Sequence, residues 1–343
     1  MKKTTKILLT LLKSGIYGEK IDLSKYSPIT ETEWWQVYEL ATQQGVVALA
    51  GEGLKKVPIE ILPPKALRLE WIGQITIQEN RYALQRGRVR ELRELWSKEG
   101  VECVELKGES VGRWYKNPSS RYSCDFDCYL SDFDKGNSII EKQGINVNID
   151  FYKNSSFTWK DLYVENHHFC TPIRGKRRMK KLERRLQQLL SDFPEYPNED
   201  FNALFLMEHA WSHFFEHAIS LKHVCDWAVF RRSCGKNVDW PRFEETAMDC
   251  GFWRFSLAFN HIADVLDGVI SEEQLNTDEQ RLLQSILKTE RHGSLSNGWT
   301  TRIDLFMSYF KYGWKYRIFS DHSMLYILGR SIWAFFFDRH PHV

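Results

Sequence analysis

Two segments decide the predicted fold: Leu106-Lys107-Gly108-Glu109-Ser110 and, further along the chain, Asp125-Phe126-Asp127. Residues 101–106 form a short β-branched run, and 122–130 have the composition of a second strand. Side chains two apart on a strand point to the same face, so both aspartates project together while the phenylalanine between them enters the opposite side. Adjacent carboxylates repel each other unless a cation or a shared proton intervenes, and Mg²⁺ ions that also bind substrate phosphates would relieve the repulsion.

The glycine turn after the first strand is suited to binding phosphate. Gly108 lets a phosphate approach the backbone, the helix expected at 109–115 offers unpaired N–H groups, and Ser110 adds a hydroxyl donor. Lys107 supplies a point charge and Arg121 a fork of donors, with a solvated or ion-paired role as the alternative for each. A triphosphate at this turn would lie beside cations held on the neighbouring strand.

Helical patterns flank this region on both sides. Thr30 and Glu33 form a capping-box start to one helix, and 66–96 forms a long helix that is expected to break near Gly87. A helix at 132–143 and three weaker strands within 145–169 follow the aspartates. Further helices are expected near 177–191, 199–220, 221–234, 239–249, 251–266, 277–290, 299–317 and 322–337.

These elements predict an α+β fold, in which a small mixed β-sheet core lies between all-helical segments. The predicted units are an N-terminal helical segment at 1–100, the α+β core at 101–175 and a C-terminal helical domain at 176–343. A chain of 343 residues is long enough for two or three such units. The order of the elements therefore places any site of the core between two sets of helices.

Composition narrows the class of protein. The net charge of +2 gives no chain-wide electrostatic preference for nucleic acid or anionic membranes. Seven scattered cysteines without a Cys-x-x-Cys pair favour reduced thiols in the cytoplasm over a disulfide framework. The apolar run 324–337 is interrupted by Arg330 and is shorter than the ~20 residues of a spanning helix, so no stable membrane insertion is expected.

Several short motifs follow one another between 101 and 170: Leu106-Lys107-Gly108, Trp114-Tyr115, Asn117-Pro118, Arg121, Asp125-Phe126-Asp127 and Val164-Glu165-Asn166-His167. Together they resemble the signature of a bacterial family of uncharacterised nucleotidyltransferases within the polymerase-beta-like superfamily. The resemblance implies that Asp125 and Asp127 are ligands of two Mg²⁺ or Mn²⁺ ions. It implies that Glu165 is the third catalytic carboxylate, with Asp150 and Asp161 as competing candidates.

The resemblance also implies a reaction. An acceptor hydroxyl would attack the α-phosphorus of a nucleoside triphosphate such as ATP and release pyrophosphate. The acceptor stays open between a small molecule, a protein hydroxyl and an RNA end, and the oligomeric state stays open as well. Glu109 follows Gly108 where the superfamily usually has Gly or Ser. This departure motivates an alternative, a non-catalytic nucleotide-binding or partner-binding module of the same fold.

His209, His213 and His217 are spaced four residues apart, nearly in one stripe of a helix. Two histidines one turn apart can chelate a metal, but a third at i+8 lies about 12 Å from the first along the axis. A second alternative is therefore a histidine-based metallohydrolase. The other interpretations are a hydrogen-bonded core role and a role of His209 and His213 in lining the nucleotide cleft, which the family resemblance favours.

A basic run at 174–185 follows the predicted core and contains only Glu183 as an opposing charge. A charge run on a helix is most often a solvated face, and binding of triphosphate or RNA is the alternative. The run has no interleaved aromatic residues, so it lacks the stacking platform of a single-strand binder.

Overall fold

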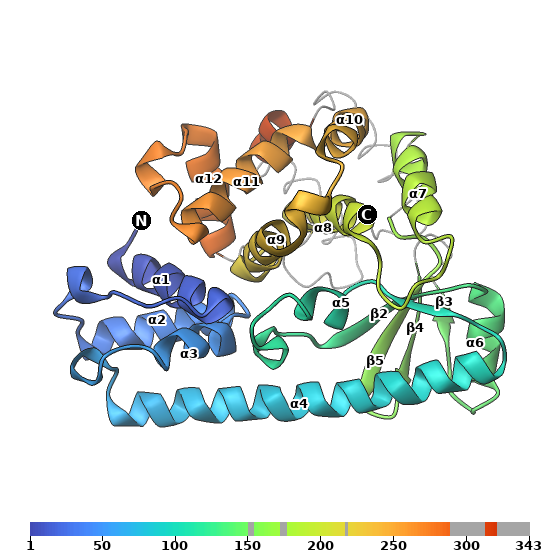
Figure 1. The fold of residues 1–343 in the computed structure, drawn as a ribbon, viewed down its shortest axis with the longest axis horizontal. Coiled ribbons are helices and arrows are strands. Elements are labelled where there is room, and N and C mark those ends of the chain that lie inside the picture. The colour runs from blue at the N-terminus through green and yellow to red at the C-terminus, as the bar shows by residue number, and fades with distance from the viewer. Residues whose placement is uncertain (150–153, 172–176, 217–218, 289–312, 321–343) are drawn as a thin grey trace, which may run out of the picture.

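A five-stranded sheet forms the centre of the protein. The computed structural model describes residues 1–149, 154–171, 177–216, 219–288 and 313–320. Figure 1 shows the long helix α4 (Lys65–Lys98) running along one side of the sheet and the C-terminal helices gathered on the other. This arrangement confirms the predicted sheet between helical segments.

The N-terminal segment is helical, as predicted. Its elements are α1 (Lys3–Tyr17), α2 (Glu31–Gln43), α3 (Val47–Leu54) and α4, with 3-10 turns at Ser24–Tyr26 and Ile59–Ile61. The predicted capping box begins α2, because the Glu33 N–H donates to the Thr30 hydroxyl and the Thr30 N–H donates to the Glu33 carboxylate. Both orphan donors at this helix start are thereby satisfied.

Helix α4 continues through Gly87, so the predicted break is wrong. A glycine inside a helix costs about 1 kcal/mol relative to alanine. The next turns bury Val89, Leu92 and Trp96 against the sheet, and each such side chain contributes about 1.5–3 kcal/mol. Tertiary packing therefore outweighs the local preference, and the helix stays straight beneath the sheet (Figure 1).

The strand order of the sheet is β1-β2-β5-β4-β3. The strands are β1 (Cys103–Glu105), β2 (Asp125–Leu130), β3 (Asn148–Ile149), β4 (Asn154–Trp159) and β5 (Leu162–His167). Only the β2–β5 pair is parallel among the described strands, and β1–β2, β3–β4 and β4–β5 are antiparallel. The helix expected at 109–115 is a single turn, α5 (Glu109–Gly112), followed by a 3-10 turn at Pro118–Ser120.

The two faces of the sheet have different chemistry. Phe126 and Val164 belong to an apolar cluster with the C-terminal half of α4 and with α6 (Phe133–Glu141). Alternation along the strands sends the carboxylates of β2 and β5 to the opposite face. Side chains of α8 and α9 lie near that face, since the Lys107 ammonium is 5.7 Å from the Phe205 ring. The polar face of the sheet is thus covered by the C-terminal helices.

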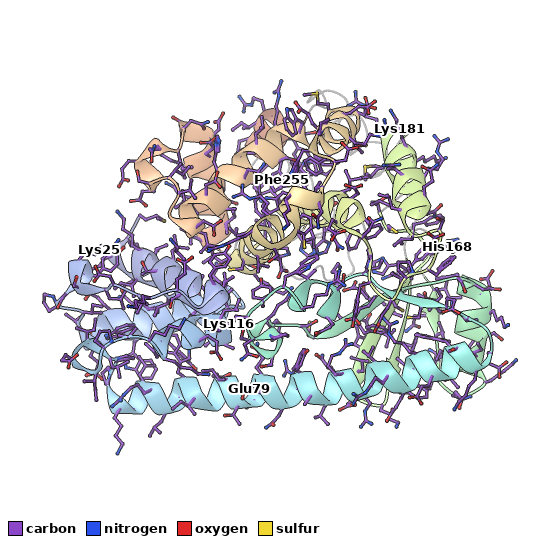
Figure 2. The ribbon with its side chains drawn as sticks, viewed as in Figure 1. Lys25, Glu79, Lys116, His168, Lys181 and Phe255 are labelled. Atoms are coloured by element: carbon purple, nitrogen blue, oxygen red, sulfur yellow. The ribbon has the colours of Figure 1, made fainter. Side chains whose placement is uncertain are left out.

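The C-terminal helices confirm the predicted helical segment over the described residues. They are α7 (Arg177–Leu189), α8 (Glu199–Glu216), α9 (Leu221–Cys234), α10 (Trp240–Cys250), α11 (Trp253–Asp267) and α12 (Thr277–Lys288). Buried aromatic residues such as Phe255 pack between them (Figure 2). The helix expected at 299–317 falls mostly, and that at 322–337 entirely, outside the described residues.

The basic run lies on α7 as far as it is described. Met179 and Leu182 face the core, whereas Lys181 is exposed at the edge of the molecule (Figure 2) and pairs with Asp249. The basic side chains of this helix are therefore a solvated face. No helix among the described residues combines the length and the apolar composition needed to cross a membrane.

Candidate functional site

Three carboxylates meet on the polar face of the sheet. Asp125 and Asp127 lie two residues apart on β2, and Asp127 is the register partner of Glu165 across the parallel β2–β5 pair. Neighbouring strands lie about 4.8 Å apart, so the three side chains emerge from adjacent positions. The Asp127 side chain is 3% exposed and that of Glu165 is 23% exposed. The structure thus sets Asp127 beside Glu165, and Asp125 lies two residues earlier on the same face of β2. Asp125 is outside the group of described residues whose ligand atoms lie within 4.8 Å of one another.

Asp127 is held as a carboxylate by two donors. The Lys107 Nζ and the His167 Nε2 each lie 2.9 Å from its Oδ1. Burial works against the ionised form, but the Lys107 charge and the His167 hydrogen bond hold the pKa of Asp127 well below its usual range. Burial also opposes the Lys107 charge, yet Asp127 and Asp125 raise the pKa of Lys107. Asp127 is therefore a carboxylate and Lys107 an ammonium, and the two form an ion pair.

The donor set suits a hard divalent cation. Ligand atoms of Asp127, Glu165 and His167 lie within 4.8 Å of one another. Carboxylate oxygens are the ligands that Mg²⁺ prefers, and Glu165 is oriented by a 2.9 Å hydrogen bond from the Asn154 amide. The Lys107 ammonium supplies positive charge beside Asp127. The residues present therefore fit the predicted magnesium centre.

Of the competing candidates for the third acid, Asp161 lies away from this place. Asp161 lies in the turn between β4 and β5, where its side chain is 55% exposed and pairs with Arg88 at 2.8 Å. Asp150 lies outside the described residues. The geometry therefore favours Glu165.

The Gly108 turn contains an internal carboxylate. Gly108 has φ 72°, a conformation that side chains other than glycine rarely adopt, and a β-carbon there would lie 2.6 Å from Glu105 Oε1. The same Oε1 accepts the Glu109 N–H at 2.7 Å, and Arg86 binds both oxygens of Glu105. The Glu105 carboxylate thus accepts the hydrogen bond of an N–H group that the sequence assigns to a phosphate.

The residues after Gly108 point away from a phosphate role. The Glu109 carboxylate accepts from the Tyr82 hydroxyl, so it is directed toward α4. Ser110 is fully buried, and its hydroxyl has no hydrogen-bond partner among the described residues. Because its side chain is buried, Ser110 does not reach a phosphate at the surface of the turn. The predicted hydroxyl contact has no support from this arrangement.

Arg121 links the sheet to α9 instead of standing free for phosphate. Its Nε and Nη2 donate to the two oxygens of Asp226 at 2.7 and 2.9 Å, and Tyr115 donates to the same carboxylate at 2.7 Å. A third nitrogen, Nη1, lies 3.4 Å from the Gly108 carbonyl oxygen. The structure gives Arg121 an ion pair, but its partner is Asp226 on α9 and not one of the three acidic residues of the sheet, with which an ion pair was the alternative.

Three imidazoles form a second cluster on α8 and α9. The ring centroids of His209 and His213 are 4.2 Å apart, and His223 lies 5.7 and 4.8 Å from them. Burial lowers the pKa of His209 and His223, that of His223 to about 3, and the Lys107 charge acts on both in the same direction. His217 lies outside the described residues, and His223 takes the third position.

Sequence reasoning assigned no role to four residues of this region, although His167 is part of a quoted motif. His167 and Asn154 bind the acidic centre, while His223 and Lys222 enter from α9. Strand alternation could have found His167, because it lies two residues after Glu165 and so shares its face. No local spacing points to the other three, since they reach the site through tertiary packing.

Comparison with known proteins identifies the family of the chain. Searches of curated proteins and of solved structures each found no match. A family model described as "uncharacterised nucleotidyltransferase" matches residues 30–266, which is more than half of the chain and includes the whole sheet with α8 and α9. The chain therefore belongs to the uncharacterised nucleotidyltransferase family.

Proposed function

We propose that the protein is a metal-dependent nucleotidyltransferase that uses Asp125, Asp127 and Glu165. The observation that carries the proposal is the register of β2 and β5, which sets Asp127 beside Glu165 with Asp125 on the same face. The family assignment supports nucleotidyl transfer in general. The choice of Mg²⁺ or Mn²⁺ rests on the oxygen donors of the three acids.

The reaction joins an acceptor oxygen to the α-phosphorus and breaks the bond between that phosphorus and the oxygen leading to the β-phosphorus, releasing pyrophosphate. A bound divalent cation would neutralise charge on the attacking and leaving oxygens. Glu165, fixed by Asn154, takes the proton of the acceptor hydroxyl or orients that hydroxyl. Lys107 is the cation best placed to pair with a phosphate oxygen, because it is 15% exposed beside the acids.

His209 and His213 keep their predicted place near the nucleotide in this proposal. The Lys107 charge acts on His209, so α8 approaches the acidic centre from the helical side. The ion pair between Arg121 and Asp226 joins the sheet to α9 and so holds the helices against the polar face of the sheet. The acceptor is not specified by these contacts, and a small molecule, a protein hydroxyl and an RNA end all fit the proposed chemistry.

The second candidate is a nucleotide-binding or partner-binding module without turnover. A specific observation favours it: the Glu105 carboxylate lies against Gly108 and accepts the Glu109 N–H, where a phosphate is expected. An anionic phosphate would have to displace that carboxylate or bind outside the turn. A module of this kind would bind nucleoside triphosphate with magnesium and release no pyrophosphate.

Labelled nucleotides separate the two candidates. Each nucleoside triphosphate, labelled at the α-phosphorus, is incubated with the protein, Mg²⁺ and cell extract, and the labelled product is identified. The proposal expects a labelled acceptor with wild-type protein and none with Asp125→Asn. Glu245→Gln, which alters an exposed ion pair on α10, is the matched control and should label fully. Tight binding without a labelled product or pyrophosphate would establish the module instead.

A further inference from the structure

We propose that His209, His213 and His223 form a binding site for a transition-metal dication, separate from the carboxylate centre. His209 and His213 lie one turn apart on α8, and His223 projects from the first turn of α9. One ligand nitrogen of each ring can be chosen so that all three lie within 4.8 Å of one another. A pair at i and i+4 with a third ligand from a neighbouring helix is a chelating arrangement.

The distances are close to those of a bound ion. Zinc–imidazole bonds are about 2.0–2.1 Å, so ligand nitrogens around a tetrahedral ion lie about 3.3 Å apart. The observed separations are at most 4.8 Å and so exceed this value by no more than about 1.5 Å, a difference that we expect rotation of the imidazole side chains to close.

Ser220 provides a hydrogen-bonding partner behind His223. Its backbone N–H and its hydroxyl both lie 3.2 Å from His223 Nδ1, within the capping box that begins α9. In this bond the Ser220 N–H donates and His223 Nδ1 accepts, which fixes the ring orientation. With a metal on Nε2, the ring proton would lie on Nδ1 and would be donated to the Ser220 hydroxyl oxygen, and the bond from the backbone N–H would be given up. The capping box thus holds the third ligand at the point where α9 meets α8.

Two lysines lie near the three rings and oppose a cation there. The Lys107 charge is offset by Asp127 at 2.9 Å, and the Lys222 charge is attracted by Asp226 and Asp125. Imidazole nitrogens prefer Zn²⁺, Ni²⁺ or Co²⁺, whereas the carboxylate centre suits Mg²⁺. Three protein ligands leave one coordination position open, which is typical of zinc sites that bind water or a substrate oxygen.

Metal titration of the full chain tests the site. Protein stripped by a chelator is titrated with Co²⁺ in excess Mg²⁺, and tetrahedral coordination is followed by visible absorbance while Zn²⁺ affinity is measured by calorimetry. We expect one equivalent to bind wild type. In His223→Gln the affinity should fall by at least about 100-fold, because loss of a partner behind a ligand already costs about 10- to 100-fold.

Matched variants decide where the ion binds. Glu165→Gln, which leaves the Lys107–Asp127 ion pair in place, and His261→Gln, which changes a histidine paired with Glu279 on other helices, should bind as wild type. His213→Gln repeats the test should His223→Gln fail to fold, as judged by circular dichroism. Wild-type affinity in His213→Gln or His223→Gln, loss of binding in Glu165→Gln, or no binding to wild type would each overturn the proposal. These measurements record metal binding alone, so their outcome does not depend on whether the protein transfers nucleotides.

Discussion

Replacing Asp226 by asparagine tests the ion pair that joins the sheet to α9. The substitution removes the charge opposite Arg121, whose side chain is 3% exposed, and weakens an acceptor shared with Tyr115. Breaking a buried pair leaves an uncompensated charge and costs about 3–5 kcal/mol. We expect the free energy of unfolding to fall by that amount, as measured by urea denaturation followed through tryptophan fluorescence.

An exposed ion pair supplies the comparison. Arg242 and Glu245 lie 2.8 Å apart with side chains 52% and 58% exposed, and such pairs contribute at most about 1 kcal/mol. Glu245→Gln should therefore change stability by less than that. An Asp226→Asn variant that loses no more stability than Glu245→Gln would refute the structural role of the pair.

A double variant separates structure from phosphate binding. Replacing Arg121 by methionine and Asp226 by leucine removes both charges, and apolar replacement of a whole buried pair is often neutral or stabilising. We expect the double variant to recover most of the stability lost in Asp226→Asn. If it does so and still binds nucleoside triphosphate as wild type, Arg121 has no phosphate contact.

Three further predictions follow from the site. Gly108→Ala should cost more stability than Gly144→Ala, because both have positive φ but only Gly108 would place a β-carbon against a carboxylate; urea denaturation of the two variants measures the difference. Lys107→Met should weaken nucleotide affinity by about 1.5–3 kcal/mol, measured by calorimetry, since it removes the charged donor beside Asp127. In chelator-treated protein, the free energy of unfolding should fall by about 1.4 kcal/mol from pH 7.5 to pH 5.5 because of His223 alone. The unfolded imidazole binds a proton near pH 6.5 and the folded one only near pH 3, so stability falls as pH falls, and His223→Gln should remove that part of the pH dependence.

The fold was predictable where local patterns are strong. The capping box at Thr30 and Glu33, the alternation around Phe126 and the helices of the C-terminal segment all follow from spacing and composition. The continuity of α4 through Gly87 was not predictable, because packing against the sheet decides it. The sequence shows a glycine that weakly favours a break in the helix, but it does not show how much apolar surface the helix buries against the sheet.

The candidate site was predictable only in its acidic part. Strand alternation places Asp125 and Asp127 together, and the family resemblance supplies Glu165. The partner of Arg121 and the third member of the histidine cluster come from α9, about a hundred residues beyond β2. Contacts over such separations depend on how helices dock, which periodicity does not encode.

The central claim, that Asp125, Asp127 and Glu165 together hold the cation required by a nucleoside triphosphate, is tested most directly by Mn²⁺ binding. Electron paramagnetic resonance reports free Mn²⁺ during titration of the protein with a non-hydrolysable triphosphate. We expect nucleotide-dependent Mn²⁺ binding in wild type and in His223→Gln, and its loss in Asp125→Asn and Asp127→Asn. Unchanged Mn²⁺ binding in both aspartate variants would contradict the claim.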